Sequence, residues 1–161
     1  KKFIALFALM VITLASYAQV YKMYNTRNYH NQLRLNTMTG EVQQIQDDGQ
    51  SWIVCSAREI SGDKESRFRL YETQNMWTFI LLDSYNGRLW QVQYSAQDLD
   101  NLFCIPINKY ELVSDNENCI FSIQPLTSMY QYYLINDRTG DMWKFQWSTK
   151  GDDYRWIEKF K

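Results

Sequence analysis

Short alternations of apolar and polar residues recur three times along the chain, each time around a glycine. The alternation is clearest in the second copy, where Gln91 and Gln93 alternate with Trp90 and Val92. A period of two residues is typical of a β-strand with one apolar and one polar face. The three copies and their glycines are residues 35–46 with Gly40, 82–93 with Gly87 and 135–146 with Gly140.

Each of these glycines ends a predicted tight turn. An Asn or Asp stands four positions before it, where the side chain can accept hydrogen bonds from the turn amides. Glycine then supplies the positive φ that closes a bulged hairpin. The Asn and Asp residues at this position are Asn36, Asp83 and Asn136. Each copy therefore predicts two antiparallel strands joined by a hairpin turn.

Two further apolar stretches accompany every hairpin, so each repeat has four predicted strands. The glycines lie 47 and 53 positions apart, which is the spacing of a four-stranded repeat unit. A single four-stranded sheet cannot bury both of its faces. We therefore expect one all-β domain over residues 19–161, with repeats of about 19–66, 67–118 and 119–161.

The strand that precedes the turn differs between the repeats. Residues 77–82 and 130–135 are apolar on both faces, which is typical of central strands covered on two sides. In the first repeat the equivalent strand, residues 30–35, instead has His30, Gln32 and Arg34 on one face. We expect this face to be open to water, as in a terminal repeat.

The turn Asp-x-x-Thr/Asn-Gly followed by Trp resembles the blade repeats of β-propellers, including the quinoprotein type. Trp90 and Trp143 stand three positions after their glycines rather than four, and Gln43 replaces the Trp in the first repeat. The resemblance implies propeller-blade-like sheets, and it does not extend to a pyrroloquinoline quinone cofactor. Because a closed propeller needs about four blades or more, three arrangements stay open: an open three-blade array, a six-bladed ring of two chains, and a β-trefoil.

The first 18 residues have the features of a signal peptide. Lys1 and Lys2 precede an apolar run over 3–14, and Ser16 and Ala18 are small enough for the subsites of a signal peptidase. The apolar run is shorter than the roughly 20 residues needed to cross a bilayer. We therefore expect cleavage after Ala18, export to the periplasm or the cell exterior, and no membrane span in the mature chain. The run also resembles the secretion signals of Bacteroidetes-type Gram-negative bacteria.

The three cysteines all lie in apolar, strand-like surroundings. Cys55, Cys104 and Cys119 are therefore expected to behave as small buried hydrophobic residues. The alternative in an oxidising compartment is one disulfide, for which Cys104 and Cys119 form the first pair to test. No cysteine adjoins the basic residues that would activate a thiolate.

Charge and composition narrow the function. The 161 residues include 17 Lys and Arg and 18 Asp and Glu, and basic residues are scattered, which disfavours a nucleic-acid groove. The single histidine, His30, disfavours a zinc site or a histidine relay. The acidic clusters lack the spacing of a calcium loop. We therefore expect no metal, no cofactor and no catalytic residue.

Tryptophans are the remaining candidates for chemistry, because flat rings stack on sugars and anchor interfaces. Trp90 and Trp143 occupy equivalent apolar positions of the repeat and are expected in the core. Trp77, Trp147 and Trp156 lie near loops or near the chain end. We expect these three at a partly exposed ligand-binding surface.

These features favour a non-enzymatic exported module that binds a protein or a glycan through a rigid β-repeat scaffold. The alternative is a structural envelope protein that self-assembles through exposed blade edges, with a homodimer as its simplest form. A small hydrolase is the third interpretation, supported only by the number of carboxylates.

Overall fold

A computed structural model describes residues 19–115 and 120–160 of the chain. The predicted signal peptide lies outside the described residues. The first sheet contains β1 (Tyr21–Asn25), β2 (Asn31–Asn36), β3 (Val42–Gln46) and β4 (Ser51–Cys55). The second sheet contains β5 (Phe68–Glu72), β6 (Thr78–Asp83), β7 (Leu89–Gln93) and β8 (Phe103–Pro106). The third sheet contains β9 (Phe121–Pro125), β10 (Gln131–Asn136), β11 (Met142–Gln146) and β12 (Trp156–Lys159).

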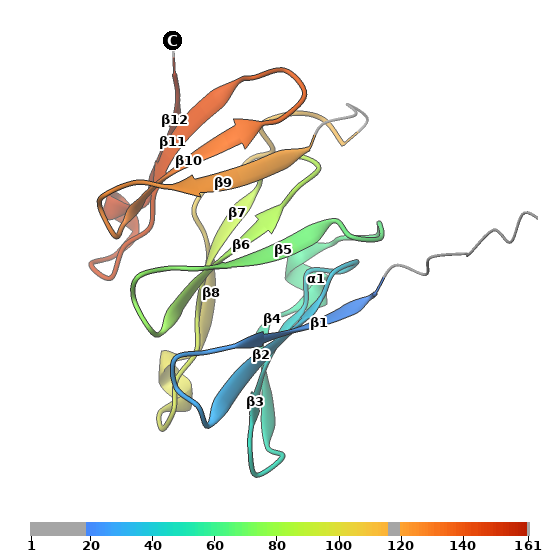
Figure 1. Ribbon diagram of the computed structural model, residues 1–161, viewed down its shortest axis with the longest axis vertical. Helices are drawn as coiled ribbons and strands as arrows, with labels where there is room; N and C mark the ends of the chain where they lie inside the picture. Colours follow the sequence, from blue (N-terminus) through green and yellow to red (C-terminus); the bar gives the residue numbers. More distant parts are fainter. Residues whose placement is uncertain (1–18, 116–119, 161) are drawn as a thin grey trace, which may run out of the picture.

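All three sheets are antiparallel meanders, and they stack face to face in chain order from the bottom to the top of Figure 1. Short helices α1 (Ala57–Ile60), η1 (Leu99–Asn101) and η2 (Asp152–Tyr154) lie in the connecting loops. The predicted all-β fold with three four-stranded, propeller-blade-like repeats is therefore confirmed. The described strands form no closed barrel.

Two hydrophobic cores hold the stack together. The first lies between the first and second sheets and includes Leu35 and Leu81, and the second lies between the second and third sheets and includes Leu82 and Leu134. Neighbouring residues of β6 point to opposite sides of the sheet. This strand is therefore buried on both faces, as the sequence pattern predicted.

The predicted turn chemistry is confirmed in all three repeats. Asn36 Oδ1 accepts hydrogen bonds from the amides of Met38 (3.0 Å) and Thr39 (3.1 Å). Asp83 and Asn136 accept from the equivalent amides at 3.1 Å. The glycines that close the turns have φ angles of 78°, 78° and 77°: Gly40, Gly87 and Gly140. Nearly identical geometry in three places makes these turns a common reference point for equivalent residues.

Counted from the turn glycine, equivalent residues of the three sheets carry the same position number. Position +3 holds Trp90 and Trp143, which are buried as predicted, and Gln43 in the first sheet. Position −6 holds Leu81 and Leu134 in the cores but Arg34 on the outside of the first sheet. The expected polar outer face of the first repeat is confirmed.

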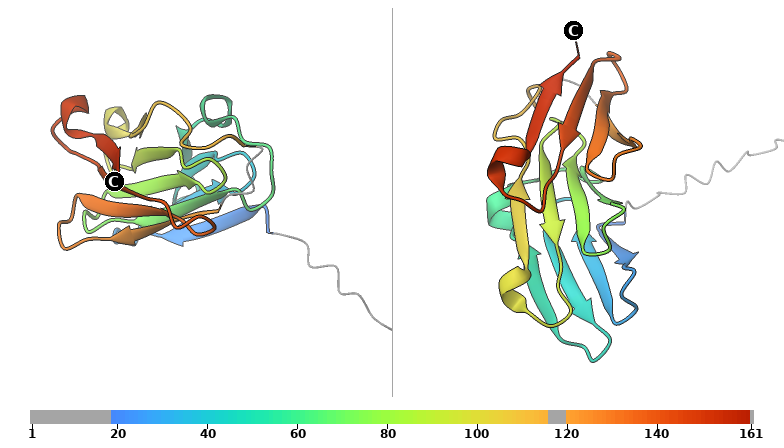
Figure 2. Two further views of the ribbon diagram at one scale, coloured as in Figure 1. Left: turned by 90° about the horizontal axis from the view of Figure 1, so that it is seen from above. Right: turned by 90° about the vertical axis from the view of Figure 1, so that its left-hand side faces the viewer.

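The third sheet differs from the prediction on one side. Residues 130–135 were expected to be covered on both faces, but β10 alternates between buried and half-buried residues. Tyr133 and Ile135 alternate with Tyr132 and Leu134 of the second core and therefore point away from it. No described sheet lies on the side of the third sheet that faces away from the second sheet (Figure 2). The prediction is therefore wrong for this face, which is apolar without being covered by the described chain.

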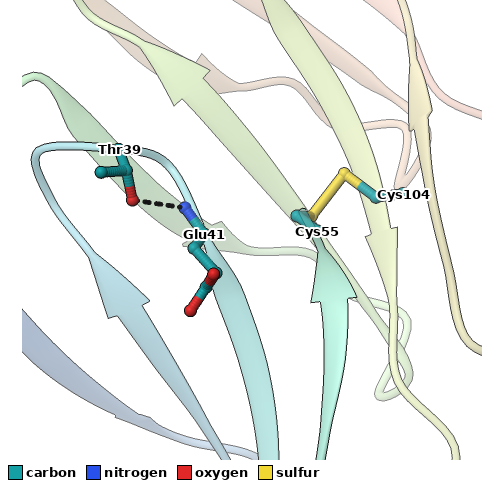
Figure 3. The surroundings of a disulfide bond; sticks show 4 residues. All are labelled: Thr39, Glu41, Cys55 and Cys104. Atoms are coloured by element: carbon teal, nitrogen blue, oxygen red, sulfur yellow. Dashed lines mark hydrogen bonds between the residues drawn. A yellow bond between two sulfur atoms is a disulfide. The ribbon is translucent and has the colours of Figure 1, made fainter. Parts of the chain in front are cut away.

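A disulfide joins the first and second sheets, contrary to the expectation of buried free thiols. Cys55 at the end of β4 is bonded to Cys104 in β8, with their Cα atoms 5.2 Å apart (Figure 3). The pairing of Cys104 with Cys119 is therefore also wrong, and Cys119 lies outside the described residues. The last strands of these two sheets contact each other, which brings together cysteines 49 positions apart in the sequence.

Candidate ligand-binding grooves

Loops at one end of the sheets, on the left in Figure 1, line two neighbouring grooves of about 620 and 470 Å³. The two grooves share Trp77, Gln93 and Asn101. The first groove is also lined by Asn28, Tyr94, Ser95, Ala96, Gln97 and Asp98. The second is also lined by Asn75, Phe103, Ile105, Ser148, Thr149, Gly151 and Arg155. Trp77 thus lies where the two grooves, both lined by several amide side chains, meet.

Local hydrogen bonds and a ring contact fix the position of Trp77. Asn75 Oδ1 accepts the Trp77 backbone N–H at 2.9 Å, and the indole packs on the Tyr94 ring with centroids 5.3 Å apart. Tyr94 is buried and donates its hydroxyl to the Met76 carbonyl at 2.7 Å. Burial raises the pKa of Tyr94, so this phenol stays neutral and supports the Trp77 ring.

The same arrangement recurs in the other two sheets. Position −10 is a ring in every repeat, and position +6 is a glutamine in every repeat. The rings are His30, Trp77 and Tyr130, and the glutamines are Gln46, Gln93 and Gln146. Smaller hollows of about 120 and 200 Å³ are lined by the pairs of the first and third sheets. We call each pair a ring-and-amide site.

The site of the first sheet has a carboxylate at a position where the other two sites have an aromatic ring. His30 Nδ1 lies 2.6 Å from Asp47 Oδ2, and this hydrogen bond holds the pKa of Asp47 below its usual range. Position +7, occupied here by Asp47, holds Tyr94 and Trp147 in the second and third sheets. The three sites therefore share a geometry and differ in chemistry.

Buried glutamines at position +4 anchor the loops that line the grooves. Gln44 Nε2 donates to the Ser95 carbonyl at 2.6 Å, and Gln44 Oε1 accepts the Ser95 N–H at 3.1 Å. In the next pair of sheets, Gln91 Oε1 accepts the Ser148 N–H at 3.2 Å. Arg27 adds hydrogen bonds to two carbonyls of the 73–77 loop. Loops held by such contacts give a groove that is formed before a ligand arrives.

The structure separates the three tryptophans predicted as a binding surface. Trp77 is half-buried and lines both large grooves. Trp147 is 0% exposed and donates its indole N–H to the Met129 carbonyl at 3.0 Å, so its expected exposure is wrong. Trp156 lies on the outer face of the third sheet, with Lys144 Nζ 5.9 Å from its ring. Only Trp77 stands at the grooves' junction.

Sequence reasoning did not identify Tyr130, Gln93 or Gln146 as site residues. The signal was nevertheless present, because alignment of the three repeats on their glycines places a ring at −10 and a glutamine at +6 in each. The site residues are therefore recognised by their equivalent positions in the three repeats rather than by residue type alone.

Comparisons with known protein families, with curated proteins and with solved structures found no match to this chain. Within residues 19–115 and 120–160, no helix is both long and apolar enough to span a membrane. The same described ranges contain no group of three or more His, Cys, Asp or Glu side chains arranged to hold a metal ion.

Proposed function

We propose that this protein is an exported, non-enzymatic binding module whose ligand is a glycan held at the ring-and-amide sites. The observation that carries this proposal is the recurrence of a ring and a glutamine at the same two positions of three consecutive sheets. An aromatic ring packs on the apolar face of a sugar, and an amide can both donate and accept hydrogen bonds. A protein ligand is the alternative that the same experiment tests.

The two large grooves favour an extended ligand. A chain that passes Trp77 from one groove into the other meets Asn28 and Gln97 on one side and Asn75 on the other. Contacts at successive sites of one rigid scaffold act together, because the first contact raises the effective concentration for the next. An oligosaccharide is therefore expected to bind more tightly than its constituent monosaccharide.

A glycan array probed with the purified protein, followed by calorimetric titration of each bound glycan, tests the proposal. Trp77→Ala is expected to weaken binding by about tenfold or more, because buried aromatic anchors contribute most of the energy of a binding site. Tyr110→Ala is the control, since it removes an aromatic side chain that is 81% exposed and lies outside every ring-and-amide site.

Thermal unfolding of both variants checks that each is folded. Failure of the wild-type protein to bind any glycan would contradict the glycan ligand and direct attention to a protein partner. An equal loss of affinity in Trp77→Ala and Tyr110→Ala would contradict the location of the site.

A further inference from the structure

We propose that the outer face of the third sheet binds the outer face of the first sheet of a second copy of this chain, head to tail. Three kinds of contact join the first sheet to the second and are repeated between the second and the third. The two outer faces carry residues for one more turn contact of the same kind, an apolar face on the third sheet, and an oppositely charged pair in place of the glutamine contact. The inference does not depend on the glycan ligand, and the residues substituted to test it lie outside the two large grooves.

The first repeated contact covers a turn glycine with an aromatic ring of the next sheet. A Cβ built on Gly40 would lie 3.1 Å from ring carbons of Phe68, and one built on Gly87 would lie 3.2 Å from ring carbons of Phe121. The backbone N–H of each phenylalanine also donates to a turn carbonyl at position −3, at 2.9 Å for Phe68 and 2.8 Å for Phe121. Each turn is thus completed by the sheet that follows it.

The turn of the third sheet has the same shape but no described neighbour. Gly140 has a φ of 77°, and no described atom lies within 4 Å of a Cβ built there. Tyr21 is the residue of the first sheet that corresponds to Phe68 and Phe121, because all three pair with position −4 of their own sheet. Tyr21 is 51% exposed. In a second copy it can therefore cover Gly140 and donate its N–H to the Asp137 carbonyl.

The second repeated contact is made by an apolar face that the following sheet buries. This face consists of positions −7, −5 and +2 and of the residue beside +2 at the end of the fourth strand or just after it. The following sheet buries Leu33, Leu35, Val42 and Cys55 of the first sheet and Ile80, Leu82, Leu89 and Ile107 of the second. The third sheet has Tyr133, Ile135, Met142 and Phe160 at these positions. All four are apolar, and Phe160 is 49% exposed. The outer face of the third sheet is thus as apolar at these positions as the two faces that are buried inside the stack.

The third repeated contact links position +4 to position +8 of the next sheet. In the two internal interfaces it joins a buried glutamine to the backbone of Ser95 or Ser148. In the third sheet position +4 is Lys144, and position +8 of the first sheet is Asp48. Stacking in the same register would place this lysine beside the aspartate of a second copy. The outer faces are therefore complementary in charge where the internal ones rely on amide hydrogen bonds.

The interface pairs two different faces, so it is heterologous. Such contacts close into a ring if the rotation between copies allows it and otherwise extend into a linear chain. The first-sheet outer face has Gln32, Arg34 and Gln43 where the second sheet has Phe79, Leu81 and Trp90. An interface with polar residues at these positions is typical of reversible association rather than of an obligate complex.

Sedimentation velocity across a range of micromolar concentrations tests the proposal. The wild-type protein is expected to gain mass with concentration. Tyr21→Ser and Phe160→Ser, one on each face, are each expected to weaken self-association by about tenfold or more, because aromatic anchors dominate interface energies. Both side chains are half exposed and lie outside the two cores, so the variants remain folded monomers.

A charge exchange tests the register. Lys144→Glu and Asp48→Lys are each expected to weaken association, because each leaves like charges facing each other. A mixture of the two variants is expected to restore association, because each contact between unlike variants joins a native or a fully reversed charge pair. Lys109→Glu makes the same charge change outside both faces and is expected to have no effect. A protein that stays monomeric throughout, or an association that both serine variants leave unchanged, would overturn the proposal.

Discussion

At the scale of single residues, the turn glycines have two separate roles. Their positive φ closes the hairpin, which is a local requirement that the sequence revealed through the Asx residue four positions earlier. Gly40 also leaves space for Ile60 and Phe68 of the chain that follows. This second role could not be predicted from the turn, because it depends on how one sheet stacks on the next.

Alanine at two equivalent glycines separates these roles. Gly140→Ala is expected to lower the free energy of unfolding by about 1 kcal/mol, the cost of an L-residue at positive φ. Gly40→Ala is expected to cost about 3 kcal/mol, because the added Cβ must also displace Ile60 and the Phe68 ring. Urea unfolding followed by tryptophan fluorescence, at concentrations where the protein is monomeric, measures both. Equal costs would show that packing against the glycine contributes nothing.

At the scale of strands and sheets, the sequence predicted where the strands lie better than it predicted which of their faces are covered. Period-two alternation placed strands such as β11 correctly, because every second residue of such a strand is buried. The same reasoning failed for β10, whose residues are apolar on both sides although the described chain covers one. A pattern reports which faces are suited to burial, and it does not say which neighbour buries them. The wrong prediction therefore points to the face for which a second copy is proposed.

The candidate site was predictable only in part for a related reason. Trp77 could be chosen by residue type, but the same criterion also selected Trp147, which is buried beneath Tyr130 with ring centroids 4.9 Å apart. Both tryptophans follow strand ends in the sequence. Whether such a ring is covered depends on the position it takes in its repeat, which is +7 for Trp147 and −10 for Trp77.

The buried glutamine of each internal interface is expected to stabilise the stack. Gln44→Leu leaves the Ser95 N–H and C=O without their glutamine partner, so we expect a loss of about 2 kcal/mol in the free energy of unfolding. The neighbouring Gln43 points to the outer face, and Gln43→Leu is expected to change stability by less than about 0.5 kcal/mol. Chemical denaturation of the two variants makes the comparison. A similar effect of both substitutions would contradict the anchoring role of Gln44.

At the scale of the whole molecule, the three sheets form a one-dimensional stack in which strands of the first sheet contact the second and strands of the second contact the third. The two internal interfaces are built from the same kinds of contact but differ in covalent chemistry. Cys55–Cys104 crosslinks the first and second sheets, whereas the equivalent positions of the next interface hold Ile107 and Ile157 of the second core. A crosslink that closes a loop of this length contributes about 2 to 4 kcal/mol by restricting the unfolded chain. The third sheet is therefore expected to open first, while the two crosslinked sheets remain folded.

Hydrogen exchange followed by mass spectrometry tests this order of opening. Amides of β10 and β11 are expected to exchange faster than those of β6 and β7, because partial unfolding of the third sheet exposes only one interface and breaks no disulfide. The double variant Cys55→Ala/Cys104→Ala is expected to accelerate exchange in β2 and β3. In this variant the amides of the third sheet are still expected to be less protected than those of the second sheet. If head-to-tail association also occurs, protection of β10 rises with protein concentration, since the second copy then covers its outer face. Uniform exchange across the three sheets would instead mean that the stack unfolds as one cooperative unit.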